Sequence, residues 1–153
     1  MSDIVILRQL SVLDSAGFLM PCSYVIDRKR HLVVSTAWGC LTVEEMRLHD
    51  DQLRNDSDFS PDFSQLADGT KIERILGSGS EVRSAVGQSP FSETSKRAFV
   101  APTPSIFGMA RMATSYIEMS GAPSQVGVFS DLASALEWLG LEGLSILTEQ
   151  GET

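Results

Sequence analysis

The fold is decided by residues 24–46, which read YVIDRKRHLVVSTAWGCLTVEEM. Two β-rich runs, residues 22–27 and 31–38, flank three basic residues, and this pattern predicts an antiparallel hairpin. The second run is almost continuously apolar, as in a strand that is buried on both faces. Thr42 and Glu45 then have the spacing of a capping box, in which each side chain bonds the other residue's free backbone N–H. A helix is therefore expected to begin at Thr42.

The rest of the chain alternates between strand patterns and helix patterns. Short apolar runs predict strands at residues 63–67, 97–101 and 125–129. Cap residues and helical spacing predict three further helices, over residues 81–86 after a Ser80 cap, over 104–119, and within 130–140. The resulting order, ββαβαβαβα, predicts an α/β domain with a mixed sheet. An antiparallel hairpin begins that sheet, and parallel βαβ crossovers continue it.

The length of 153 residues suits one domain with a full hydrophobic core. Residues 22–140 carry the alternating pattern and are expected to form that domain. Residues 1–21 are interpreted as an N-terminal extension, in which residues 4–13 suit an extra strand or an arm. Residues 141–153 are interpreted as a C-terminal tail.

Composition excludes several classes of partner and compartment. A formal net charge of −8 disfavours binding to nucleic acid or to an anionic membrane surface. No apolar run reaches the length of a membrane span, and the first residues lack the pattern of a signal peptide. Two cysteines without metal-type spacing fit a reducing compartment, so we expect a cytoplasmic protein. Since no phosphate-loop, dinucleotide or metal motif is present, we expect no cofactor and no metal.

Four phrases, in chain order, carry a resemblance to a known family: YVIDRKRHLVVSTAWGCLTVEEM, DFSPDFSQLAD, RAFVAPTPSIFGMARM and VFSDLASALEWLG. Over residues 22–140 the chain resembles a bacterial STAS-like family, named after sulfate transporters and anti-sigma-factor antagonists. The resemblance implies an antagonist-like fold, also grouped with the CRAL-TRIO lipid-binding fold. It also implies a non-enzymatic regulatory or protein-interaction module that binds a protein partner or itself as a homo-oligomer. Members of this family are largely uncharacterised.

The antagonists that the family resembles carry a phosphorylated Ser or Thr after the third strand, at a helix N-terminus. The resemblance therefore implies Thr70, Ser78 and Ser80 as candidate phospho-acceptors. The chain departs from the pattern, because the next helix is expected to begin about ten residues after Thr70. A capping hydroxyl is the alternative role for Ser80.

Side chains that could catalyse a reaction do not form a recognisable motif. His31 adjoins the basic turn and is expected to be exposed, and His49 is expected at the surface or at an interface. Adjacent residues on a helix do not share a face, so His49 and Asp50 are not a ligand pair. Cys22 is expected in the core and Cys40 at a more exposed position. No catalytic residue is therefore expected.

The helix predicted over residues 104–119 has an apolar arc wider than one core contact requires. One interpretation is a well-buried helix that uses methionine to fill gaps. The other is a contact with a second chain or a ligand, with Met112, Met119 and Leu48 as candidate interface residues.

The two functions make different structural predictions. A protein-interaction module predicts an exposed apolar strip near Met112 and no converging polar cluster. The alternative, a CRAL-TRIO-like binder of a small apolar ligand, predicts a closed pocket. The pocket residues expected in that case are Phe99, Phe107, Met109 and Tyr116.

Overall fold

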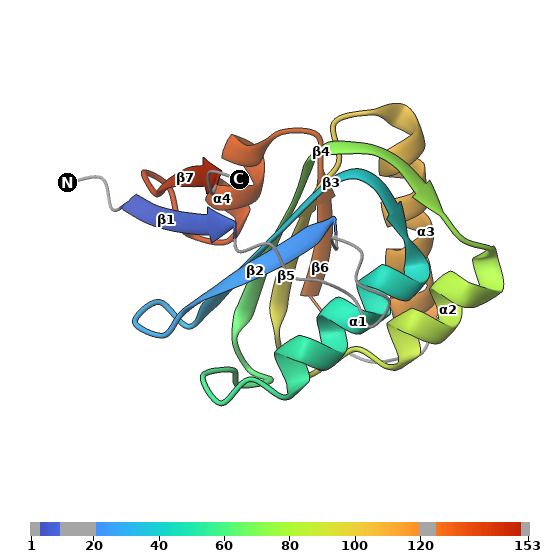
Figure 1. Cartoon of the computed structure of the whole chain (residues 1–153), viewed down its shortest axis with the longest axis horizontal. Coiled ribbons are helices and arrows are strands. Elements are labelled where there is room, and N and C mark those ends of the chain that lie inside the picture. Colours follow the sequence, from blue (N-terminus) through green and yellow to red (C-terminus); the bar gives the residue numbers. More distant parts are fainter. Residues whose placement is uncertain (1–3, 10–20, 120–124, 151–153) are drawn as a thin grey trace.

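The computed structural model describes residues 4–9, 21–119 and 125–150, and it places a five-stranded sheet at the centre of the molecule (Figure 1). The strand order is β2-β3-β4-β5-β6. β2 is antiparallel to β3, whereas β4, β5 and β6 each join in parallel. The predicted mixed sheet and the predicted order of elements from residue 22 onward are confirmed. The strands are β2 (Cys22–Asp27), β3 (Leu32–Thr42), β4 (Ser64–Leu76), β5 (Lys96–Val100) and β6 (Gln125–Phe129).

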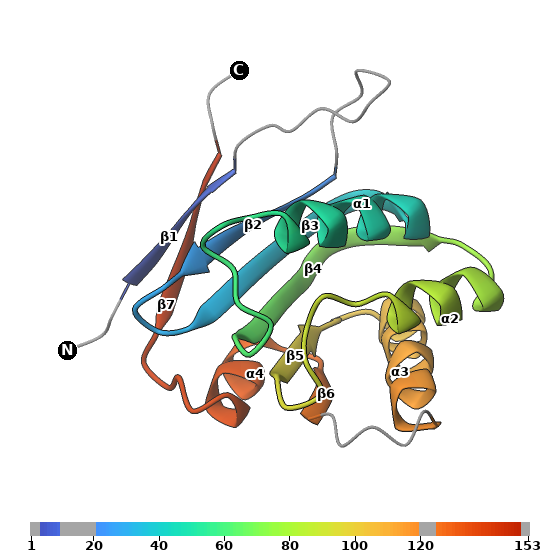
Figure 2. The ribbon, with the colours of Figure 1, turned by 90° about the horizontal axis from the view of Figure 1, so that it is seen from below.

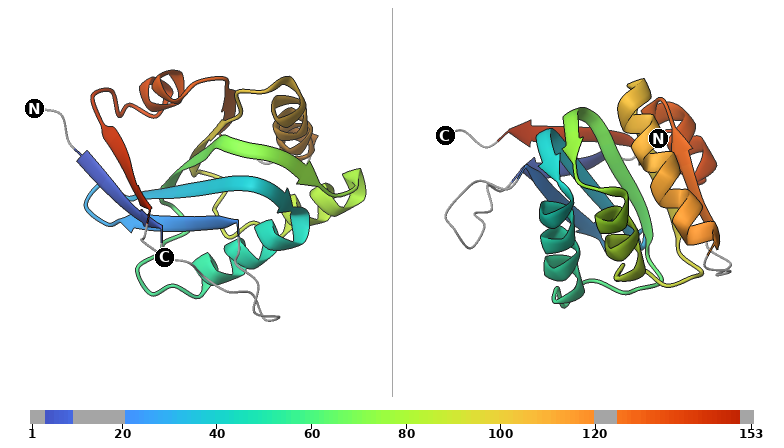
Figure 3. Two further views of the ribbon diagram at one scale, coloured as in Figure 1. Left: turned by 45° about the horizontal axis from the view of Figure 1, so that its top comes forward. Right: turned by 90° about the vertical axis from the view of Figure 1, so that its right-hand side faces the viewer.

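Four helices cover the two faces of this sheet. They are α1 (Val43–Arg54), α2 (Gly79–Gly87), α3 (Pro104–Met119) and α4 (Leu132–Trp138). The first three lie side by side over one face, in the order α1, α2, α3 (Figure 3). The fourth packs on the other face, against β4, β5 and β6 (Figure 2). None of the helices in the described ranges has the length and apolar character needed to cross a membrane.

Two further strands pair with each other outside the main sheet. β1 (Ile4–Gln9) and β7 (Ser145–Gln150) are parallel, and β1 lies beside β2. β1 falls in the N-terminal extension. β7 lies in the segment that the sequence led us to describe as a tail, so the two ends of the described chain meet in one ribbon.

The two faces of the sheet differ in how completely they are filled. Residues on alternate positions of β3, β4 and β5 meet α4 in a tightly packed core with Leu144. This core contains Leu32, Val34, Leu66, Ala98, Val100, Ala135, Leu136 and Leu144. The intervening positions, which face α1, α2 and α3, include several polar residues, and there the packing leaves a cavity.

The α2 cap corrects one sequence prediction. Ser78, and not Ser80, caps the helix: its Oγ accepts from the Glu81 N–H at 3.2 Å, and Glu81 Oε1 accepts from the Ser78 N–H at 3.3 Å. The capping box requires an acid three residues after the cap, and Ser78 alone has that spacing to Glu81. The Thr42–Glu45 box at the start of α1 is confirmed.

β4 is longer than predicted and continues past Asp68 and Gly69 to Leu76. Gly69 makes this path feasible, because a Cβ there would lie only 2.6 Å from the carbonyl oxygen of Val100. Two register shifts against β3 accompany the extension. The extended part of β4 brings Ile72 and Ile75 to the wall of the cavity.

Candidate functional site

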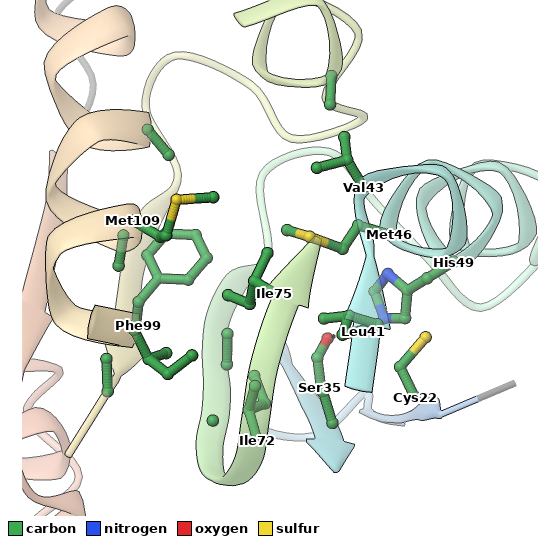
Figure 4. A pocket seen from close by; sticks show the side chains of 18 of the residues that line it. Cys22, Ser35, Leu41, Val43, Met46, His49, Ile72, Ile75, Phe99 and Met109 are labelled. Atoms are coloured by element: carbon green, nitrogen blue, oxygen red, sulfur yellow. Dashed lines mark hydrogen bonds between the residues drawn. The ribbon is translucent and has the colours of Figure 1, made fainter. Parts of the chain in front are cut away.

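A cavity of about 190 Å³ lies between the sheet and helices α1, α2 and α3 (Figure 4). Its walls are predominantly apolar and come from both layers. On the sheet side they include Leu41, Ile72, Ile75 and Phe99, and on the helix side Val43, Met46, Val82, Ile106, Met109 and Ile117.

Small side chains create the space. Six alanines line the cavity: Ala37, Ala67, Ala85, Ala101, Ala110 and Ala113. Native interiors contain few voids larger than a water molecule. An apolar cavity of about 150 Å³ is large enough to bind benzene. The space in this protein therefore suits a ligand the size of a substituted benzene ring or a chain of about six carbons.

A chain of hydrogen-bonded polar side chains forms part of the lining. Ser35 Oγ lies 3.1 Å from His49 Nε2, and it accepts from Gln65 Nε2 at 3.1 Å. On the other side of the ring, His49 Nδ1 lies 3.1 Å from Asp50 Oδ1. The Asp50 carboxylate can only accept, so it favours a proton on Nδ1 and leaves Nε2 to accept from the Ser35 hydroxyl.

Arg97 extends this chain on β5. Its Nε donates to Gln65 Oε1 at 2.9 Å, and its guanidinium carbon lies 4.5 Å and 5.2 Å from the ring centroids of Phe91 and Phe99. Burial lowers the pKa of Arg97 to about 10, and the charge on Asp50 acts in the opposite direction. Arg97 therefore remains a cation at neutral pH.

Cys22 also lines the cavity, whereas Cys40 is exposed. Burial, followed by the negative charges of Glu45 and Asp50, raises the pKa of the Cys22 thiol to about 12. The thiolate is the reactive form of cysteine. Cys22 is therefore a thiol in the wall with little nucleophilic character at neutral pH.

The Ser35, His49 and Asp50 side chains follow the order of a serine-hydrolase relay. Ser35, however, lies within β3 and not on a sharp turn that would present its hydroxyl to a substrate. Its oxygen also accepts a hydrogen bond from Gln65, which reduces its nucleophilic character. The arrangement is better suited to holding a polar group of a ligand.

The structure brings together two of the four predicted pocket residues. Phe99 and Met109 line the cavity. Phe107 and Tyr116 are half-buried but are not among the lining residues, and the Tyr116 ring instead faces Arg83 at 5.9 Å. The helical spacing of α3 explains why Phe107 and Tyr116 are absent from the lining. The side of α3 that faces the sheet is occupied by Ile106, Met109, Ala110 and Ala113.

The other predicted site residues lie away from the cavity. Thr70, Ser78 and Ser80 are exposed, with Thr70 inside β4 and Ser78 at the α2 cap. Of the predicted interface residues, Met119 is 75% exposed, whereas Met112 and Leu48 are half-buried. Leu48 packs near Cys22 and Leu41.

The polar residues of the cavity were missed by the sequence reasoning. His49 was expected at the surface or at an interface, but it is buried within the domain and only 6% exposed, so that prediction is wrong. The burial of His49 could have been predicted from its spacing, because it lies three residues after Met46 and four before Leu53, on the apolar stripe of the helix. The position of Arg97 could have been predicted in a similar way, because Arg97 and Phe99 are two residues apart on β5 and therefore point to the same face of the sheet.

The fold and the cavity together define a class: an α/β domain with one mixed sheet and an amphipathic space beneath three helices. No family model matches the sequence, and no curated protein matches it. Among solved structures, the chain is similar to an uncharacterized protein of the DUF3478 family with a SpoIIAA-like fold from Shewanella loihica. The two chains are 20% identical, the match covers 77% of this chain and 93% of the other, and the TM-score is 0.47.

Proposed function

We propose that this protein is a non-enzymatic module that binds a small, mostly apolar molecule in the cavity between the sheet and α1, α2 and α3. The observation that carries the proposal is the cavity itself. Its volume of about 190 Å³ is walled by apolar side chains from both layers and has a linked polar cluster on one side. Natural small-molecule sites combine apolar walls with a few placed polar groups in the same way.

The polar cluster supports one of the two functions that the sequence left open. A module that only binds other proteins predicts no converging polar cluster. Here Ser35, His49 and Gln65 converge on the cavity from β3, α1 and β4 respectively, and Arg97 reaches it from β5. Ligand binding accounts for both the polar cluster and the unfilled space, so it is the function that the geometry supports best.

Filling the cavity from α3 tests this proposal. Ala113→Leu places three further carbons in the space, and Ala133→Leu is the matched control on the exposed face of α4. Unfilled apolar volume costs about 24 cal/mol per Å³, so we expect Ala113→Leu to raise the melting temperature of the ligand-free protein by a few degrees. It should also abolish the thermal shift that small apolar probes such as hexanamide and benzamide produce in the wild type.

The control variant should bind these probes as the wild type does. If Ala113→Leu and the wild type show equal shifts, the probes bind elsewhere and the proposed site is wrong. If no apolar probe of this size shifts the wild type, the proposed function itself fails.

Self-association is a second candidate, favoured by the exposure of two large apolar side chains, Leu76 and Met119. In this case a regulatory partner or a second copy of the chain would cover the outer side of α3 near Met112. Light scattering of Met112→Glu provides the test. An unchanged oligomeric state would remove this surface from consideration. Thr70, Ser78 and Ser80 stay predictions as phospho-acceptors, and a cytoplasmic location is likewise part of the proposal.

A further inference from the structure

We infer that the ligand of this cavity is a small monocarboxylate, whose apolar body fills the space and whose carboxylate binds the guanidinium of Arg97. This inference rests on the proposed ligand-binding function and specifies its substrate class. Two observations support it: the N–H donors of Arg97 that have no acceptor among the described residues, and the charged side chains near Arg97.

Arg97 has donors to spare. A guanidinium carries five N–H groups, and within the described ranges only the Nε–H has an acceptor, in the bond of 2.9 Å to Gln65 Oε1. Among the side chains that the structure describes, no carboxylate lies within ion-pair distance of Arg97 and no other acceptor bonds its Nη groups. The Gln65 bond fixes the position of the guanidinium group, and the rings of Phe91 and Phe99 flank it.

A cation in such surroundings favours an anionic partner. Moving a charge from water into an apolar site is unfavourable unless hydrogen bonds or an opposite charge compensate it. The two aromatic rings supply part of that compensation, through cation–π contacts. A carboxylate can accept two parallel N–H bonds from one guanidinium, the strongest arrangement that this side chain forms.

The neighbouring charges limit the ligand to one negative charge. Asp50 and Asp68 also line the cavity, and Arg97 is the one basic residue besides His49 in the described lining. The Asp50 carboxylate contacts His49 and interacts with Arg97 through space, and the Asp68 carboxylate accepts from the Thr70 N–H. A doubly charged group such as phosphate would be repelled by these acids, and its body would lack the apolar surface that the walls require.

The size of the space gives the second restriction. About 190 Å³ holds a ring of six carbons or a chain of similar length, together with the carboxylate. Hexanoate and benzoate are therefore suitable probes. Each has a neutral amide of almost identical shape, hexanamide and benzamide, which keeps the apolar body and removes the charge.

The test compares these pairs by calorimetric titration at pH 7.5. We expect each carboxylate to bind wild-type protein at least about tenfold more tightly than its amide. Arg97→Met should remove this preference, so that carboxylate and amide bind the variant equally. Arg97→Lys keeps the charge without the two-pronged geometry, so it should retain part of the preference. Asp50→Asn removes a negative charge next to the site, and it should strengthen carboxylate binding about threefold or more.

The possible outcomes distinguish a failure of the carboxylate inference from a failure of the proposed ligand-binding function. Equal binding of carboxylate and amide by the wild type would overturn the inference and leave apolar ligand binding intact. Failure of all four probes to bind would remove both. The comparison in the wild type needs no variant, so it stands even if Arg97→Met does not fold, and circular dichroism of each variant checks folding.

Discussion

Cys22 and Cys40 show how two identical side chains acquire different chemistry from their positions. Cys22 is buried in the cavity wall with Glu45 and Asp50 nearby, whereas Cys40 lies exposed on β3. Because burial and negative charge disfavour the thiolate, and the thiolate is the reacting form, the two thiols should differ strongly in reactivity.

We predict that Ellman's reagent at pH 8 modifies Cys40 at least about 100-fold faster than Cys22. The rates are measured separately, in Cys22→Ser for Cys40 and in Cys40→Ser for Cys22. If the two variants react at similar rates, the cavity wall is open enough to expose the Cys22 thiol, and the described burial is wrong.

Asp27 gives a pH dependence that belongs to the hairpin turn. Burial raises its pKa, but hydrogen bonds from Arg30 outweigh this effect and lower the pKa below its ordinary value of 3.8. The Arg30 side chain and backbone N–H donate to Asp27 at 2.5 Å and 3.0 Å. A carboxyl with a lowered pKa in the folded state stabilises the fold above the unfolded pKa. This contribution is lost as the pH falls through the folded value.

We therefore expect Asp27→Asn to lower the free energy of unfolding by about 1–2 kcal/mol at pH 7. The cost should shrink as the pH falls below about 4, because the Asp27 carboxyl becomes protonated first in the unfolded chain and then, at lower pH, in the folded one. Urea unfolding of the wild type and of Asp27→Asn between pH 7 and pH 3 measures this difference in the free energy of unfolding. Asp58→Asn is the control, because its carboxylate is 55% exposed and should contribute little. An equal cost of Asp27→Asn at pH 7 and pH 3 would contradict this account.

The helix caps illustrate what local sequence determines at the scale of an element. Thr42 and Glu45 gave the correct start of α1 because both halves of the capping box lie within four residues. The same rule, applied to Ser78 and Glu81, would have given the start of α2. The full length of β4 was not predictable in this way, because it depends on the close approach of Gly69 to Val100 on the neighbouring strand.

Ser78→Ala tests the corrected cap. The hydroxyl and the Glu81 side chain satisfy backbone donors at the start of α2, so the loss of this box should lower stability by about 1 kcal/mol. Ser80→Ala is the matched control, since Ser80 is exposed in the first turn and should change stability by less than about 0.5 kcal/mol. Urea unfolding compares the two. A larger loss of stability in Ser80→Ala than in Ser78→Ala would mean that Ser80 is the N-cap of α2, as the sequence first suggested.

At the scale of the whole molecule, the two faces of the sheet have different roles. The face under α4 is closed by aliphatic packing around Leu66 and Leu136. Between the opposite face and its three helices, six alanines together with Ser35, His49, Gln65 and Arg97 line a space. Period-two alternation along β3, β4 and β5 assigns each residue to one of these faces.

The sequence predicted the order of elements and the mixed sheet, because hydrophobic periodicity and caps are local signals. It did not predict the cavity, because the polar residues that meet there are 14 to 32 positions apart along the chain. Ser35, Gln65 and Arg97 converge only through the register of three neighbouring strands. His49 joins them because α1 packs across β3.

The most direct test of the central claim is native mass spectrometry of the full-length protein purified from its own cells, with Ala113→Leu measured in parallel. The account predicts that the wild-type chain carries a small molecule that is released on denaturation. It also predicts that added hexanoate forms a complex of one molecule per chain, and that Ala113→Leu shows neither. If both chains give only the mass of the bare protein, with and without hexanoate, the cavity is not a ligand site and the account is contradicted.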